Sequence, residues 1–396
     1  MATTARAIRC GTLFDATGAP PIRDAVVIVA DGRITACGPA AATPVPRSAE
    51  VIDLGDRFVM PGLIDCHSHA SIVPALGDQL GQIRRGPVPQ ALAATANLRR
   101  DLAAGTTTMR LMGEEHFMDV ELREAIEAGV VPGPRLLIAT RGLAANNAHG
   151  RGLAGFDGVD EVRRAARENL RRGAAHIKIF VTGGVSSPGA MPTGSGYTRE
   201  EIRAAVEEAD RAGTYAAAHA HGGPGLRLAV EEGASTIEHG ALATDDDIAL
   251  IKERGAWLIC TFGIFLHKEG IEGGDGQRPA IMEKMRWARR LVDENFPRHL
   301  ASGVRYACGT DAVHGQMPFE LATLVRLGVP NRDALLAGTR WGAEACRVAA
   351  DVGTIEAGKR ADLIAIEGDP LRDMDAMTRV RLVMKDGDVH SALALG

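Results

Sequence analysis

The stretch GLIDCHSHA, residues 62–70, decides the fold, because it is a short apolar run that ends in two histidines, His67 and His69. Similar apolar runs recur along the middle of the chain, and several end in a polar side chain. Ala-, Glu- and Arg-rich stretches with helical spacing lie between them, and most of these end in glycine, as helices do. This alternation predicts a (β/α)8 barrel, in which catalytic groups sit at the carboxyl ends of the strands. The eight candidate strands are residues 62–69, 106–112, 135–140, 176–181, 214–220, 235–240, 256–262 and 304–310.

The two ends of the chain have a different pattern, with short β-branched runs broken by turn residues. Residues 25–38, AVVIVADGRITACG, predict a hairpin that turns at Asp31-Gly32. The last 40 or so residues look similar, so we expect one small β-sandwich domain assembled from both ends. The predicted domains are residues 1–60 plus 351–396 for the sandwich and residues 61–350 for the barrel.

Composition excludes several classes of function. The net charge of -5 and the aromatic content of 4% argue against nucleic-acid binding. The chain has no apolar run of the roughly 18 residues that a membrane helix needs. The six cysteines are widely spaced without a CxxC pair, which is typical of reduced cysteines. We therefore expect a cytoplasmic protein that acts on a small molecule.

The pattern of polar residues at the strand ends indicates a metal centre. Because side chains two apart on a strand share a face, His67 and His69 can reach one metal ion, although surface histidines are the alternative. Lys178 lies inside the strand 176–181, where an unpaired ammonium is costly. It either extends to the rim, pairs with a carboxylate, or has a lowered pKa that lets its amine capture carbon dioxide. The resulting carbamate is an anionic ligand able to bridge two metal ions.

Three more residues complete the candidate ligand set. His219 and His239 end the next two strands, and Asp311 follows the eighth. A carboxylate such as Asp311 can bind a metal through one oxygen while the other accepts a proton. Zinc lowers the pKa of bound water to about 7, so a hydroxide nucleophile is available near neutrality.

Several motifs resemble those of the amidohydrolase superfamily: residues 61–69, 177–184, 218–222, 237–240, 309–312 and 353–371. Within it the chain most resembles the prolidase-like, Xaa-dipeptidase branch, which has a carboxylated lysine and includes imidazolonepropionase-related proteins. The resemblance covers nearly the whole chain. It implies that one zinc ion is bound by His67, His69 and Asp311 and a second by His219 and His239. It also implies that a carboxylated Lys178 bridges the two ions.

Candidate substrate contacts follow from the same resemblance and from the loops near the strand ends. His149 lies in a loop that contacts substrate in relatives, and His221 polarises the scissile carbonyl or supports the metal ligands. Segment 267–290 is expected to cover the mouth of the site. Arg141 and Arg151 are candidates for binding a substrate carboxylate, and Tyr197 for lining the mouth. Phe262 and Phe265 either shape an apolar side-chain pocket or pack in the core.

The expected activity is hydrolysis of an amide bond in a dipeptide or an N-acyl amino acid by a metal-bridged hydroxide. In this hypothesis Asp311 acts as the base and then as the acid toward the leaving amine. A lactonase, or a hydrolase of cyclic or xenobiotic amides, would use the same centre. A catalytically silent scaffold is a further alternative, and homo-oligomers are expected for this superfamily.

Overall fold

A computed structural model describes residues 5–392 of the chain, with the exception of residues 147 and 188. All eight strands predicted for the middle of the chain form, and every pairing among them is parallel. They make two sheets, one of three strands and one of five. In order across the sheets they are β6 (Leu63–Ser68), β7 (Thr106–Leu111) and β8 (Arg135–Leu137), and then β13 (Arg305–Cys308), β12 (Trp257–Cys260), β11 (Thr236–His239), β10 (Ala216–Ala220) and β9 (Ile177–Phe180).

The two sheets meet along both of their edges. Leu143, which follows β8, donates its N–H to the carbonyl of Lys178 (2.9 Å) and accepts from the N–H of Phe180 (2.8 Å). At the other edge the N–H of Asp311 donates to the carbonyl of His67 at 2.8 Å. Gly309 permits this approach, because a Cβ atom there would lie 2.4 Å from the backbone nitrogen of His67. Residues just beyond the strands therefore join the edges, and the parallel strand ends lie close together.

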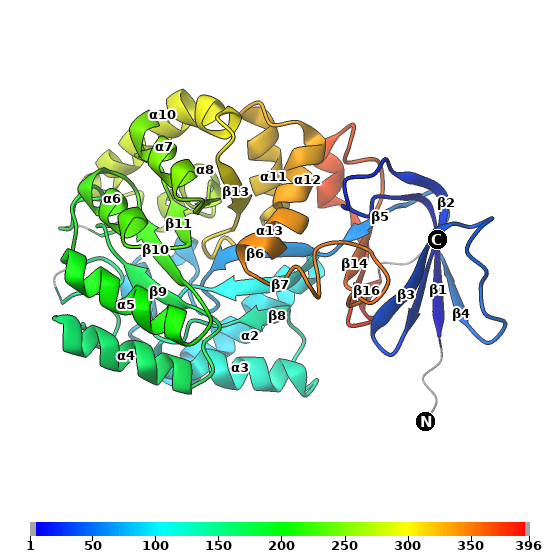
Figure 1. The fold of residues 1–396 in the computed structure, drawn as a ribbon, viewed down its shortest axis with the longest axis horizontal. Helices are drawn as coiled ribbons and strands as arrows, with labels where there is room; N and C mark the ends of the chain where they lie inside the picture. Colours follow the sequence, from blue (N-terminus) through cyan, green and yellow to red (C-terminus); the bar gives the residue numbers. More distant parts are fainter. Residues whose placement is uncertain (1–4, 147, 188, 393–396) are drawn as a thin grey trace.

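Helices cover the outside of these sheets and bury their apolar outer faces, as Figure 1 shows. Two of the helices begin with a capping box, at Thr198 and at Thr244, where side chains satisfy the first free N–H groups. The covering helices are α2 (Pro87–Ala103), α3 (Met118–Glu127), α4 (Val159–Arg171), α5 (Arg199–Arg211), α6 (Gly223–Glu231), α7 (Asp245–Glu253), α10 (Pro279–Ala301), α11 (Met317–Arg326), α12 (Asn331–Ala337) and α13 (Arg340–Ala345).

A separate eight-stranded sheet draws its strands from both ends of the chain. The predicted hairpin forms with Asp31 and Gly32 at its turn, both at positive φ. The strands are β1 (Arg6–Leu13), β2 (Ile22–Ala30), β3 (Arg33–Pro39), β4 (Glu50–Asp53), β5 (Phe58–Pro61), β14 (Leu363–Ile366), β15 (Val380–Lys385) and β16 (Asp388–Ala392). The strands follow the order β16-β15-β14-β5-β1-β2-β3, with β4 paired to β1, and they bury an apolar core of their own.

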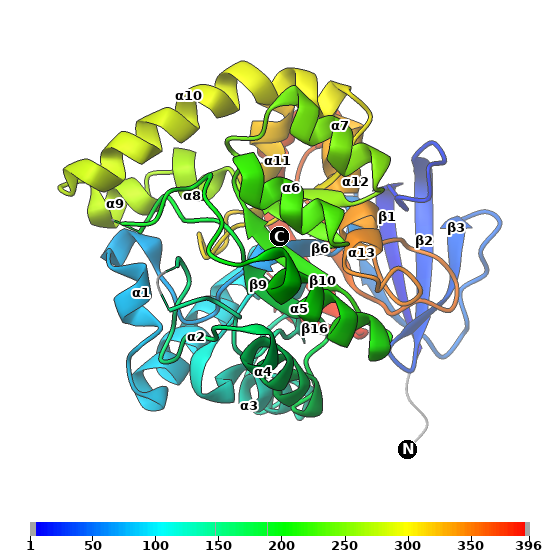
Figure 2. The ribbon, with the colours of Figure 1, turned by 60° about the vertical axis from the view of Figure 1, so that its left-hand side comes forward.

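Short helices surround the carboxyl ends of the parallel strands. Figure 2 shows α1 beside α9, where the N–H of Asp78 donates to Asp275 at 3.3 Å. The segment predicted to cover the mouth, residues 267–290, contains α9 and the first half of α10. The remaining short helices are η1 (Pro74–Leu76), α1 (Gln79–Gln82), η2 (Glu115–Phe117), α8 (Gly263–Leu266), α9 (Ile271–Asp275) and η3 (Met374–Thr378).

The helices of the described residues include none that is both long enough and apolar enough to span a lipid bilayer.

Candidate metal centre

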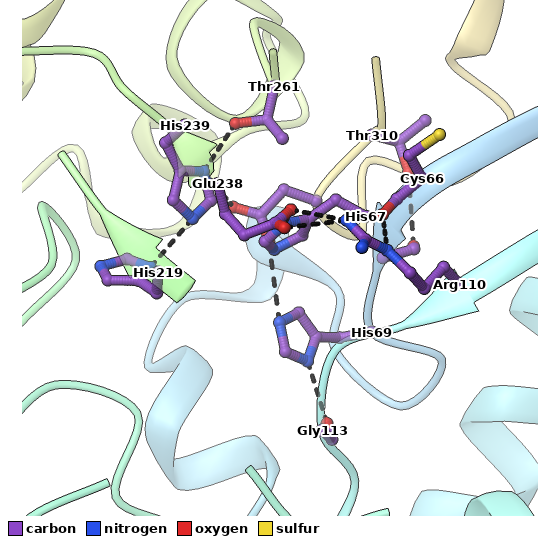
Figure 3. A network of polar contacts seen from close by, with 12 residues as sticks. Cys66, His67, His69, Arg110, Gly113, His219, Glu238, His239, Thr261 and Thr310 are labelled. Atoms are coloured by element: carbon purple, nitrogen blue, oxygen red, sulfur yellow. Dashed lines mark hydrogen bonds and ion pairs between the residues drawn. The ribbon is translucent and has the colours of Figure 1, made fainter. Parts of the chain in front are cut away.

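The structure brings the six predicted ligand residues to the carboxyl ends of the parallel strands. Nε2 of His67 lies 3.5 Å from Oδ1 of Asp311, and Nε2 of His69 lies 3.8 Å from the same oxygen. On the other side of the cluster, Nε2 of His239 lies 2.9 Å from Nδ1 of His219. Figure 3 shows three of these imidazoles converging from different strands. Residues far apart in the sequence thus form one compact group of nitrogen and oxygen donors.

Each of the four imidazoles uses one ring nitrogen to contact the protein. Because that contact fixes the ring, the other nitrogen remains available for a ligand, which is the usual arrangement of metal-binding histidines. In every case the second nitrogen faces the cluster. The contacts to the protein are His67 Nδ1 with Glu238 (2.7 Å), His69 Nδ1 with the carbonyl of Gly113 (3.0 Å), His239 Nδ1 with Thr261 (2.7 Å) and His219 Nε2 with the carbonyl of Gly183 (3.3 Å).

Lys178 is fully buried, and its Nζ has no hydrogen-bond partner among the described residues. The amine lies 4.4 Å from the centre of the Phe180 ring. Burial lowers the pKa of Lys178 to about 8, although the carboxylates of Glu238 and Asp311 oppose this shift. A neutral amine is therefore accessible near physiological pH, which is the form that reacts with carbon dioxide.

The protonation states of the cluster suit metal binding. Burial lowers the pKa of His69 to about 3 and holds the pKa values of His219 and His239 well below the ordinary value. Burial alone would raise the pKa of Asp311, but the neighbouring His67, His69 and Lys178 lower it below its ordinary value. Neutral imidazoles and an ionised carboxylate are the forms that coordinate divalent ions. The residues present therefore fit a pair of divalent metal ions.

Two of the ligand residues have an unusual backbone conformation. His239 has φ of 72° and Asp311 has φ of 48°, so both are in the left-handed region although neither is glycine. Such conformations are strained and tend to occur at functional sites, where the surrounding structure enforces them. The strain turns both side chains toward the cluster at the points where their strands end.

A cavity that opens to solvent lies directly above the cluster. The imidazole of His221 stacks on His239 at 4.9 Å, and its Nδ1 is buried without a partner among the described residues. The ring centre of His149 lies 4.6 Å from the ring centre of His219, and Nδ1 of His149 is 2.5 Å from the hydroxyl of Ser187. Apolar side chains form most of the remaining wall: Ile72, Leu80, Ile83, Phe180, Val185, Ile264, Phe265 and Ile271.

Four of the predicted substrate contacts are not among the residues that line this cavity. Arg141 pairs with Glu168 of α4 at 2.9 Å, and its guanidinium lies over the ring of Phe117. Phe262 packs against Phe296 at 5.2 Å, in the core between helices. Tyr197 is also buried in that core, and Arg151 is absent from the lining although its neighbour Gly150 belongs to it.

Of the two phenylalanines that the sequence suggested for an apolar pocket, one lines the cavity, and two charged residues below the centre were not predicted. Phe265 lines the cavity in place of Phe262, because the chain enters helix α8 at Gly263 and the strand alternation ends there. Arg110 and Glu238 form a buried ion pair beneath the ligands. The available signal was a charged residue inside each of two apolar strands, TTTMRLM and STIEHG.

Comparisons with known proteins agree with this geometry. Residues 58–390 match the model of the amidohydrolase family. Ochratoxinase of Aspergillus niger is 29% identical over 435 residues, covering 98% of this chain and 87% of that protein. Imidazolonepropionase of Nocardia farcinica is 28% identical and covers 87% of this chain and 86% of that protein.

Solved structures show the same relationship. The crystal structure of a Xaa-Pro dipeptidase with methionine bound in its active site aligns with a TM-score of 0.88 at 28% identity. That alignment covers 98% of this chain and 100% of the dipeptidase chain. Together with the match over most of its length, this shows that the chain is a hydrolase that belongs to the amidohydrolase family.

Proposed function

We propose that this hydrolase binds two Zn²⁺ ions and cleaves the amide bond of a dipeptide or an N-acyl amino acid. The observation that carries the proposal is the convergence of four imidazole ring nitrogens and one carboxylate beneath an open cavity. In this proposal the two parallel sheets form one (β/α)8 barrel. Residues 1–60 and 351–396 form the second domain.

His67, His69 and Asp311 would hold one ion, and His219 and His239 the other. Lys178 would bridge them after its neutral amine adds to carbon dioxide and releases one proton, so that the buried lysine becomes an anion. When bound, the two ions supply Lewis acidity and a water molecule of lowered pKa.

The protein groups around the centre have separate roles. Asp311 accepts a proton from the attacking water and then returns it to the leaving amine. His221, whose Nδ1 is free of protein partners among the described residues, donates to the developing oxyanion of the substrate carbonyl. His149, fixed by Ser187, orients the substrate beside it.

The shape of the cavity indicates the kind of side chain that the substrate carries. Phe180 and Phe265 face the space above the ligands, together with six aliphatic residues. Burying apolar surface against such a wall contributes about 25 cal/mol per Å². We therefore expect a large apolar or aromatic group on at least one side of the scissile bond.

A second candidate function is hydrolysis of an uncharged cyclic amide, lactone or xenobiotic amide. One observation favours it: no lysine or arginine is among the described residues that line the cavity. A free substrate carboxylate would then have only neutral imidazoles and the bound metals to contact. The two candidates differ in whether the substrate needs a negative charge.

Amine release by the zinc- and bicarbonate-supplemented protein tests both candidates. The matched probes are N-benzoyl-phenylalanine and its uncharged carboxamide, with an aromatic lactone as a third. Faster cleavage of the carboxylate supports the first candidate, and faster cleavage of a neutral probe supports the second. If the protein binds two metal ions but cleaves no amide or lactone in a broad library, both candidates fail. A protein that binds no metal would instead match the catalytically silent scaffold.

A further inference from the structure

A buried ion pair lies directly beneath the proposed metal site. Arg110 of β7 and Glu238 of β11 are both 0% exposed. Nη2 of Arg110 donates to both carboxylate oxygens of Glu238, at 2.8 and 3.0 Å. The guanidinium also donates to the carbonyl of Cys66 at 2.5 Å and to the hydroxyl of Thr236 at 3.1 Å. A buried pair of this kind needs such complete hydrogen bonding to offset the loss of hydration.

Glu238 in turn contacts a proposed metal ligand. Its Oε2 lies 2.7 Å from Nδ1 of His67, as Figure 3 shows. An ionised carboxylate can only accept a hydrogen bond, so Nδ1 of His67 must carry a proton. In the neutral imidazole the other nitrogen, Nε2, then carries no proton, and it faces Asp311 at 3.5 Å. The contact therefore selects the tautomer of His67 that can bind a metal.

Arg110 limits what the carboxylate of Glu238 can do. Because the guanidinium contacts both oxygens, the carboxylate cannot turn toward the metal site without breaking these bonds. Thr236 also donates its hydroxyl proton to Oε1 of Glu238. The carboxylate therefore stays where it orients His67 and does not compete with the proposed ligands.

The other half of the centre is held differently. Nδ1 of His239 contacts the hydroxyl of Thr261 at 2.7 Å. A hydroxyl can donate or accept, so this contact permits either tautomer of His239. His69 and His219 each face a carbonyl, which can only accept, so the two halves differ at His67 and His239, of which only His67 has its tautomer defined.

We propose that Arg110 and Glu238 are positioning residues that set the affinity of the metal ion held by His67, His69 and Asp311. The inference rests on the proposed function, because it requires that this ion binds. Arg110 fixes Glu238, Glu238 fixes the tautomer of His67, and the ion at this half of the centre is held more tightly than its neighbour. Outer partners of metal-bound histidines typically change metal affinity about 10–100-fold when removed.

The test compares graded variants with two controls. Glu238→Gln keeps an oxygen acceptor for His67, whereas Glu238→Leu removes it. Thr261→Val removes the corresponding partner of His239. Arg135→Met breaks the Arg135–Asp362 pair, an arginine–aspartate contact at 2.5 Å that lies outside the cavity lining.

Metal affinity is measured by dialysing the zinc-loaded proteins against a graded chelator and counting the retained ions by mass spectrometry. Glu238→Leu should weaken the more tightly held ion about 10–100-fold, and Glu238→Gln should weaken it less. Thr261→Val should affect mainly the weaker ion, and Arg135→Met should affect neither. Equal affinities of Glu238→Leu and the wild type would overturn the inference.

A second readout reports the tautomer of His67 without reference to activity. Nitrogen-15 spectra of the metal-free, histidine-labelled protein should show Nδ1 of His67 protonated, with the signal assigned through His67→Gln. Glu238→Leu should give a mixture of tautomers. The double variant Arg110→Met/Glu238→Gln avoids an unpaired buried charge and keeps the oxygen acceptor, so it should retain the wild-type tautomer.

The outcomes separate this inference from the proposed function. Loss of both ions together, with a lower melting temperature of the metal-free protein and an unchanged tautomer, would show a purely structural role and overturn it. The expected pattern of metal loss in a protein that cleaves no amide would support the inference while the proposed substrates fail. A wild-type protein that binds no divalent ion would overturn both.

Discussion

Two groups of buried histidines in this molecule, His314 and the histidines of the proposed centre, have opposite bonding. His314, three residues beyond Asp311, uses both ring nitrogens within the protein, contacting Asp101 at 2.8 Å and the carbonyl of Ile72 at 2.9 Å. Each ligand histidine of the centre uses only one ring nitrogen to contact surrounding groups outside the ligand set. A buried histidine whose nitrogens are both satisfied is structural, whereas one with a free nitrogen facing its neighbours is suited to bind something.

The two regions also differ in charge. Burial opposes protonation of His314, but the carboxylate of Asp101 outweighs it and raises the pKa of His314. In the centre, burial dominates and lowers the pKa values of His69, His219 and His239. The surroundings thus favour the protonated form of the imidazole in one region and the neutral form, with a free lone pair, in the other. A variant at His314 should therefore lower stability, whereas variants in the centre should lower metal binding or cleavage.

The largest effect is expected from Lys178→Met. This variant keeps the length of the side chain but has no amine to form a carbamate, so the bridge between the two ions is lost. We expect amide cleavage to fall by at least about 1,000-fold, a loss comparable to removing a key catalytic group. The rate on the fastest matched probe measures it, and an unchanged rate would exclude the bridging role.

His239→Asn should have the next largest effect. Asparagine tolerates the left-handed backbone that position 239 requires, so the variant removes the imidazole with little added strain. We expect the affinity for one of the two ions to fall by about 100-fold or more, beyond the usual effect of an outer partner. Metal counts and the melting temperature of the metal-free protein check this. The opposite result would be a variant that still binds two ions but whose metal-free form melts at a lower temperature than that of the wild type.

His314→Phe should lower stability and leave the metal content intact. Removing one partner of a buried pair leaves Asp101 uncompensated, which costs about 3–5 kcal/mol. Because the pKa of His314 is raised, its stabilising charge is fully present below the unfolded value of about 6.5 and is lost as the pH rises through the folded value. Urea unfolding should therefore show a larger difference from the wild type at about pH 6 than at about pH 9. An equal difference at both would contradict the charged pair.

The smallest effect is expected from Phe265→Ala, because it changes only the wall of the cavity. We expect kcat/KM to fall about 10-fold for the probe with the larger aromatic group and to change little for a small one. Phe262→Ala is the matched control, since that ring is packed in the core and its loss should cost about 3–5 kcal/mol of stability. Steady-state kinetics and urea unfolding on both variants measure the contrast. Equal kinetic losses would place both rings at the substrate.

The strands and the convergence of six polar side chains at their ends could be predicted from the sequence, because both depend on local patterns. Several apolar runs end in a polar residue, as in GLIDCHSHA. To predict that these residues converge, one needs only the rule that the carboxyl ends of parallel strands meet. The contacts of loop residues could not be predicted. Arg141 pairs with Glu168 on a helix that sequence alone cannot place beside it. The Arg110–Glu238 pair could not be predicted either. In the sequence each residue is a single charge inside an apolar strand, and nothing shows that the two are partners.

The sheet built from both ends of the chain has a consequence for how the protein is made. Strand β5 pairs with β1 on one side and with β14 on the other, joining Phe58–Pro61 to Leu363–Ile366. During synthesis the second edge of β5 stays open until nearly the whole polypeptide has left the ribosome. An unpaired edge invites association with other chains, and contacts of such long sequence separation form slowly. A message truncated before codon 363 would therefore yield a chain with a permanently open edge, a ready target for chaperones and proteases.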